Sequence, residues 1–118
     1  MTNLPPGWHT LTPRIFVDDP ERLVGFIRKV FAATGDYQAN RPSEIRIGDS
    51  TLMISGTELR PRQTACLYVY VDDLDEVFER SVTAGAKVIE SPTNMHYGDR
   101  RCTVEDAWGN VWQIATRK

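Results

Sequence analysis

The stretch "HYGDRRCTVEDAWGNVWQIAT", residues 96–116, carries more information about the fold than any other part of the chain. A polar opening that contains glycine leads into a strand-like segment, then into a turn at 106–110, and then into a second apolar strand. Gln113 stands late in that second strand, so its side chain belongs to one particular face of a sheet. The pattern therefore raises the question whether Gln113 binds a metal ion, belongs to the wall of a binding site, or has no special role.

The region before this stretch repeats a pattern that also occurs near the N-terminus. "VDD" stands at 17–19 and again at 71–73, each time after a strand-like apolar run and before a segment with apolar residues at helical spacing. The repeat indicates that the chain contains two copies of one strand–helix unit.

Helix start and stop signals are present in both copies. In the first copy, Asp18 or Asp19 is expected to cap a helix that ends at Gly35, and in the second copy Asp73 is expected to cap a helix that ends at Gly85. Acidic residues also suit the positive end of a helix dipole. We therefore interpret the Asp pairs as caps and not as catalytic acids.

Three short strands are expected after each helix, because apolar and β-branched runs alternate there with turn signals. The expected strands lie at 36–40, 43–48 and 51–55 after the first helix, and at 86–90, 100–105 and 110–116 after the second. The sequence thus predicts one α+β domain built from two tandem βαβββ modules, at about 10–56 and 65–117, joined by a linker at about 57–64.

A doubled βαβββ unit of this length resembles the vicinal oxygen chelate superfamily, which includes glyoxalase I, extradiol dioxygenases, fosfomycin-resistance enzymes and bleomycin-resistance proteins. The two "VDD" helix starts, "TAGA" at 83–86 and the stretch at 97–116 carry the resemblance, which covers about residues 10–117. It implies that the two modules form a half-open curved sheet around a cavity. It also implies that two chains pair as a homodimer.

The resemblance implies four positions at which catalytic relatives hold a divalent metal ion. Here they are Thr12, a residue near Leu52 or Met53, Cys66 and Gln113. Divalent ions of this class prefer imidazole or carboxylate ligands, for which these side chains are poor substitutes. We therefore expect no metal ion and no other cofactor, and we interpret Gln113 as a hydrogen-bonding group in a cavity wall.

Strand alternation assigns further side chains to the cavity. An inward Arg14 requires an acidic partner, for which Glu105 is the candidate, or an anionic ligand. Trp108 either overhangs the cavity or plugs it, and the tyrosines either grip a ligand or pack on another chain. The expected ligand-binding residues are Arg14, Phe16, Met53, Cys66, Tyr68, Tyr70, Arg101, Trp108 and Gln113.

Composition narrows the range of partners. The 118 residues are 41% hydrophobic and 25% charged with a net charge of −2, which suits a globular domain and argues against nucleic acid or an anionic membrane as partner. No apolar run approaches the ~20 residues of a membrane span, and the N-terminal segment lacks the features of a signal peptide. We expect a cytoplasmic protein in which Cys66 and Cys102 are buried thiols.

These observations leave three functional hypotheses. The favoured one is metal-independent binding, or sequestration, of a medium-sized and partly aromatic organic molecule, as the resemblance to bleomycin-resistance proteins implies. The second is a lyase or isomerase of the glyoxalase type with an atypical metal site. The third is a structural or regulatory homodimer without a ligand. No nucleophile–base pair is evident, so the sequence favours binding over catalysis.

Overall fold

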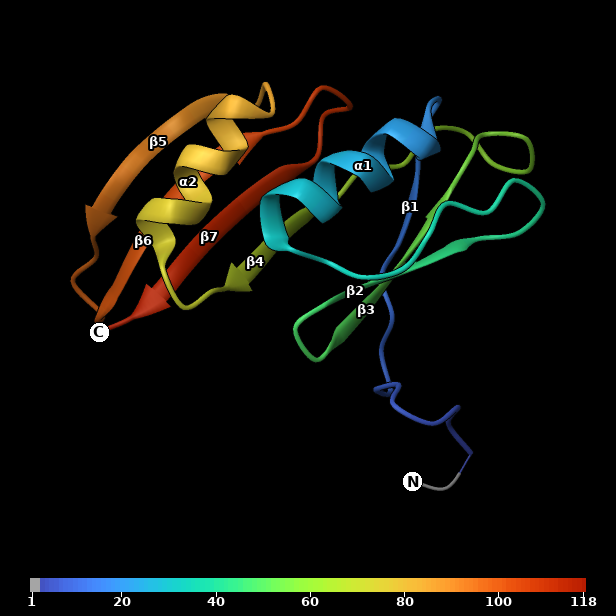
Figure 1. Ribbon diagram of the computed structural model, residues 1–118, viewed down its shortest axis with the longest axis horizontal. Helices are drawn as coiled ribbons and strands as arrows, with labels where there is room; N and C mark the ends of the chain where they lie inside the picture. The colour runs from blue at the N-terminus through green and yellow to red at the C-terminus, as the bar shows by residue number, and fades with distance from the viewer. Residues whose placement is uncertain (1–2) are drawn as a thin grey trace. The chain divides into compact units, whose positions relative to one another are not determined.

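The structure is a computed structural model that describes residues 3–118 and consists of two compact units, which divide between Gln63 and Thr64 (Figure 1). Each unit contains one helix and one mixed sheet, in the order strand, helix, strands. The expected α+β fold of two βαβββ-like modules is confirmed.

The first unit contains a three-stranded sheet in the order β1-β3-β2, in which β1 is parallel to β3 and β2 is antiparallel to β3. The helix α1 packs on β2 and β3, and the apolar side chains of both layers are buried between them because this removes them from water. The elements are β1 (Arg14–Phe16), α1 (Pro20–Phe31), β2 (Ser43–Ile47) and β3 (Ser50–Ser55).

The second unit contains a four-stranded sheet in the order β4-β7-β6-β5, with β4 parallel to β7 and the other pairs antiparallel. The helix α2 crosses one face of this sheet (Figure 1) and contacts β5, β6 and β7. The elements are β4 (Cys66–Tyr70), α2 (Leu74–Thr83), β5 (Lys87–Asn94), β6 (Asp99–Glu105) and β7 (Val111–Arg117). In both units we call the face opposite the helix the open face.

Both helices begin at the aspartates that the sequence offers as caps. Asp19 accepts a hydrogen bond from the backbone N–H of Arg22 at 3.4 Å, and Asp73 accepts one from Glu76 at 3.2 Å. These bonds satisfy backbone donors that the first helical turn leaves free. At the other end of α2, Gly85 adopts a positive φ of 96°, and its N–H donates to the carbonyl of Val82.

The expected end of α1 at Gly35 is wrong, because the helix ends at Phe31 and the next residue, Ala32, caps it in a left-handed conformation with φ 53°. The chain then extends, and Thr34 exchanges two backbone hydrogen bonds with Arg46 of β2 at 3.0 and 2.9 Å. Gly35 has another function: a Cβ atom there would lie 2.3 Å from the carbonyl oxygen of Glu44. Glycine permits this close approach of two backbone segments.

Two of the expected strands differ from the structure. The segment 36–40 forms no strand, because its backbone turns away after the bridge at Thr34, and the N–H of Gln38 donates to the Ser43 hydroxyl at 2.8 Å. The strand expected at 86–90 continues to Asn94 through register irregularities that accommodate Pro92. The first unit therefore has one strand fewer than its βαβββ pattern predicts.

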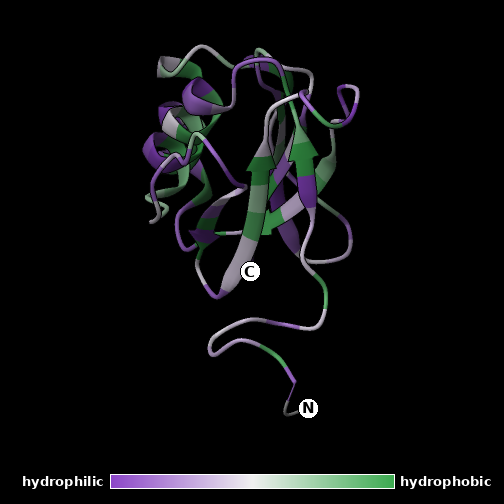
Figure 2. Ribbon diagram, turned by 90° about the vertical axis from the view of Figure 1, so that its right-hand side faces the viewer, coloured by the Kyte–Doolittle hydropathy of each residue, from purple (hydrophilic) through white to green (hydrophobic). Residues whose placement is uncertain are grey.

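The strands of both sheets carry hydrophobic and hydrophilic patches (Figure 2), and the most deeply buried apolar side chains lie under the helices. In the first unit, Ile15, Ile45 and Ile54 are buried on the face that α1 covers. In the second unit, Val104, Trp112 and Ile114 are buried on the face that α2 covers. Over residues 3–118, neither helix combines the length and the apolar character that crossing a membrane requires.

Candidate functional site

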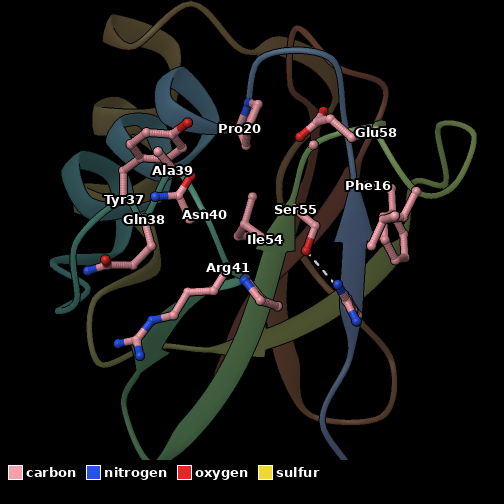
Figure 3. A pocket seen from close by; sticks show the side chains of 14 residues that line it. Phe16, Pro20, Tyr37, Gln38, Ala39, Asn40, Arg41, Ile54, Ser55 and Glu58 are labelled. Carbon is pink, nitrogen blue, oxygen red and sulfur yellow. Dashed lines mark hydrogen bonds between the residues drawn. The ribbon is translucent and has the colours of Figure 1, made fainter.

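A pocket of about 320 Å³ lies within the first unit, where β1 and β3 end and β2 begins. Figure 3 shows Tyr37 and Arg41 on one side of this pocket, Phe16 on the other, and Ile54 between them. The volume lies at the lower end of the range that is typical of small-molecule sites. The lining residues are Arg14, Phe16, Pro20, Tyr37, Gln38, Ala39, Asn40, Arg41, Pro42, Ile54, Ser55, Gly56, Glu58 and Leu59.

Arg14 stands on the open face of the first sheet, directly opposite Met53. Its Nε donates a hydrogen bond to the Ser55 hydroxyl at 3.1 Å, which is the dashed line in Figure 3, and its guanidinium carbon lies 4.8 Å from the centre of the Phe16 ring. The structure thus provides a hydroxyl and a cation–π contact for Arg14, for which the sequence predicts either an acidic partner such as Glu105 or an anionic ligand. Met53 is half-buried and is not among the lining residues.

The sequence did not indicate the pocket wall at 37–42, because this segment was expected to be part of a strand. The run "QANRPS" at 38–43 offered a signal, since Asn, Pro and Ser cluster in loops and turns. That signal predicts a loop but not its position beside β3, which depends on the bridge between Thr34 and Arg46.

In the second unit, the pairing register places Tyr68, Gln113, Thr103 and Glu90 in one row across the open face. Tyr70 lies in the next row, with its ring centre 5.4 Å from that of Tyr68. Residues directly opposite each other on neighbouring strands share a face, so this row is a property of the backbone pairing. Tyr68 and Tyr70 are 39% and 57% exposed, and their rings are therefore available to a ligand.

Asp99 connects the two tyrosines. Its carboxylate accepts hydrogen bonds from the hydroxyls of Tyr68 at 2.7 Å and Tyr70 at 2.9 Å, and a further one from Arg117. Burial alone would raise the pKa of Asp99, but the three donors outweigh burial and hold this pKa below its ordinary value. Burial, the hydroxyl of Tyr97 and the Asp99 carboxylate together raise the pKa of Tyr68, so its hydroxyl remains protonated.

A second cluster on the same face surrounds Arg101. Its guanidinium donates to both carboxylate oxygens of Glu90, at 3.0 and 3.2 Å, and to the hydroxyl of Tyr97 at 3.1 Å. Thr103 donates to the same Glu90 carboxylate at 3.1 Å. Hydrogen bonding to Arg101 is the main reason why the pKa of Glu90 is lowered, and the Glu90 carboxylate in turn raises the pKa of Arg101.

Gln113 differs from its neighbours on this face. It is half-buried between Tyr68 and Thr103, and within residues 3–118 its side-chain amide has no hydrogen-bond partner. Cys66 is exposed at the start of β4, so the expectation that both thiols are buried is wrong for this residue. Cys102 is buried on the helix side, and burial raises the pKa of its thiol to about 11.

The turn at 106–110 is held by the carboxylate of Asp106. One oxygen accepts from the backbone N–H groups of Trp108 and Asn110, and the other accepts from the Asn110 amide and the Trp112 indole, all at 2.9 Å. Asn110 also accepts from the N–H of Ala65 at 3.0 Å. The turn within this stretch of sequence is therefore stabilised by the Asp106 carboxylate and has a structural role. The half-buried Trp108 is part of this turn.

The side chains present do not fit the divalent metal ion that the resemblance implies. Within residues 3–118 there is no group of three His, Cys, Asp or Glu residues that could hold a metal ion. Leu52 is buried on the helix side of its sheet and has no donor atom, while Cys66 and Gln113 offer a thiol and a neutral amide. A hydroxyl, a thioether, a thiol and an amide are a weak donor set for a catalytic divalent ion.

Comparisons with known proteins agree with this fold. An uncharacterized protein of Mycobacterium bovis is 26% identical over 122 aligned positions, which cover 88% of this chain and 80% of that protein. The structure of TioX from Micromonospora sp. ML1 superposes with a TM-score of 0.80 at 22% identity, covering 93% of this chain and 99% of that chain.

A glyoxalase/bleomycin resistance protein/dioxygenase family enzyme from Burkholderia phytofirmans PsJN is similar at a TM-score of 0.79 and 19% identity, covering 91% of this chain and 97% of that chain. At these identities the solved structures show a shared fold. The sequence itself matches the profile of the family over residues 7–114, which is nearly the whole chain. The chain therefore belongs to the glyoxalase/bleomycin resistance protein/dioxygenase superfamily.

Proposed function

We propose that this protein binds a medium-sized, partly aromatic organic molecule without the help of a metal ion. The observation that carries the proposal is the pocket of the first unit, where Phe16 and Tyr37 form apolar walls and Arg14 supplies a polar anchor. Small-molecule sites typically combine apolar walls with a few placed polar groups. The pocket has this composition and a sufficient volume.

The open face of the second unit supports binding more than catalysis. The hydroxyls of Tyr68 and Tyr70 are already engaged by Asp99, so the rings stand in fixed positions and present flat apolar surface. The Gln113 amide beside them is available for a hydrogen bond. Fixed rings lose little conformational entropy when a ligand packs on them, which favours affinity.

A glyoxalase-type lyase or isomerase is the competing function, and it requires a divalent ion in the catalytic relatives. Leu52 has no donor atom, and Cys66 and Gln113 offer only a thiol and a neutral amide, so the chemistry of these side chains favours binding without metal. Sequestration of a drug, as the name "bleomycin resistance protein" in the family suggests, fits a site that holds its ligand and leaves it unchanged.

The test is an NMR titration of the ¹⁵N-labelled protein, kept in EDTA, with bleomycin-type glycopeptides and a panel of aromatic antibiotics. The expected result is saturable shift changes for amides of β1, β3 and the segment 37–42, or for amides of β4 and β7 around Tyr68 and Gln113. Silence at both places across the panel would contradict the proposal. Binding that requires added Ni²⁺, Zn²⁺ or Mn²⁺ would instead favour the metal-dependent enzyme.

A further inference from the structure

Three charged side chains line the pocket of the first unit, namely Arg14, Arg41 and Glu58. Two guanidinium groups and one carboxylate leave the lining with an excess of one positive charge. This excess is local, since the whole chain carries a net charge of −2. A positive pocket on a negative protein attracts anions to one place.

The arginines of the pocket differ from those arginines of the chain that form ion pairs. Arg28 pairs with Asp36 at 2.7 Å, and Arg100 pairs with Asp75 at 3.0 Å. Within residues 3–118, in contrast, neither Arg14 nor Arg41 has a carboxylate within 4.0 Å of its guanidinium nitrogens.

The position of Arg14 prepares it for a ligand. The bond from its Nε to Ser55 and the ring of Phe16 below its guanidinium fix the plane of this group, while its two terminal nitrogens remain without an acidic partner. A guanidinium offers these terminal donors as a planar fork that matches a carboxylate. Because the fork is already oriented, a ligand that binds to it pays little for ordering the side chain.

We propose that the ligand of this pocket is an aromatic carboxylate, whose acid group accepts hydrogen bonds from Arg14 and whose ring lies between Phe16 and Tyr37. This inference rests on the proposed function and names the class of its ligand. Arg41 lines the side of the pocket away from Phe16 (Figure 3), and its charge adds a weaker, longer-range attraction for an anion. Glu58 opposes a second negative charge, so a monoanion suits the lining better than a phosphate dianion.

The test uses isothermal titration calorimetry of the full chain with benzoate, 1-naphthoate and indole-3-acetate, each beside its neutral carboxamide. At least one carboxylate is expected to bind tenfold or more tightly than its amide. Arg14→Gln is expected to reduce carboxylate affinity by about 10- to 100-fold and to leave amide affinity unchanged, because a charge-assisted fork is lost. Arg14→Lys should recover only part of the affinity, because an ammonium lacks the fork.

Arg22→Gln is the matched control, since Arg22 lies on α1, outside the pocket lining, and the substitution removes the same charge. It should leave the affinity unchanged. Arg41→Gln provides a second pocket variant, with an expected loss of about threefold to tenfold from charge attraction alone. Thermal melting of each variant confirms that it is folded.

Each outcome separates this inference from the proposed function. If carboxylates and amides bind equally, or if Arg14→Gln leaves carboxylate binding unchanged, the acid preference is wrong while small-molecule binding stands. Tighter binding of 1-naphthyl phosphate than of 1-naphthoate would also contradict the expected preference for a monoanion. If no carboxylate binds but a neutral compound of the antibiotic panel does, only the inference fails. If neither the carboxylates and their amides nor the antibiotics bind, both this inference and the proposed function are wrong.

Discussion

On the sheet of the second unit, Asp99 accepts hydrogen bonds from both Tyr68 and Tyr70. On the sheet of the first unit, Arg14 donates to Ser55 and lies over the Phe16 ring, and it has no acidic partner within residues 3–118. The polar groups of the second face mostly satisfy one another and leave few hydrogen-bonding groups for a ligand. On the first face, the terminal nitrogens of Arg14 remain available for further hydrogen bonds. A ligand can form hydrogen bonds with donors that the protein itself does not use. For this reason the pocket of the first unit is the stronger candidate site.

The hairpin turns of the two units also differ in how many hydrogen bonds hold them together. The turn between β2 and β3 is formed by Gly48 and Asp49, and the side chain of Asp49 is 86% exposed. The turn between β6 and β7 is longer and surrounds the buried carboxylate of Asp106, which accepts four hydrogen bonds. The second unit is thus stabilised by buried polar clusters that the first unit lacks at the corresponding place.

The largest expected effect is therefore that of Asp106→Ala. This substitution leaves two backbone donors, an amide and the Trp112 indole without their acceptor, and we expect it to lower the free energy of unfolding by about 3–5 kcal/mol. Asp49→Ala is the matched control, with an expected change within about 0.5 kcal/mol because its carboxylate is exposed. Urea unfolding followed by circular dichroism measures both. Equal losses would show that the two turns contribute alike.

A smaller loss of stability is expected when the pH is lowered. Because hydrogen bonding holds the pKa of Asp99 in the folded chain below the value of about 3.9 in an unfolded chain, its contribution to stability is present above about pH 4 and is lost as the pH falls through the folded pKa. Urea midpoints between about pH 2 and pH 6 should therefore fall more steeply for the wild type than for Asp99→Asn. Parallel curves for the two proteins would contradict a stabilising role of this carboxylate.

The elements that the sequence predicted depend on local spacing. The caps at Asp19 and Asp73, the turn at 106–110 and the alternation along β4 each follow from residues within one turn or one strand. The repeated βαβββ module then indicates which strands belong to the same sheet, and alternation along each strand indicates which side chains share a face. For this reason the sequence predicted the α+β architecture. It also predicted that Arg14 and Phe16 face a cavity, and both line the pocket of the first unit.

The features that the sequence did not reveal depend on distant contacts. Asp99 stands 31 residues after Tyr68 in the chain, and no local pattern distinguishes it from a loop residue before a strand. The pocket wall around Tyr37 and Arg41 similarly requires the chain after α1 to bridge to β2 and not to form a strand of its own. Local propensity could not decide between these paths, because tertiary pairing overrides it.

The smallest expected effect compares the two candidate sites directly, because it removes one hydroxyl from the open face of the second unit and one from the pocket wall of the first unit. Tyr68→Phe takes a donor from Asp99 and should cost about 1 kcal/mol of unfolding free energy, while Tyr37→Phe, whose hydroxyl has no partner within residues 3–118, should cost less than about 0.3 kcal/mol. Differential scanning calorimetry at neutral pH measures both. A cost for Tyr37→Phe as large as that for Tyr68→Phe would show that the polar groups of the pocket wall are also satisfied within the protein, and it would remove this reason for preferring the pocket as the ligand site.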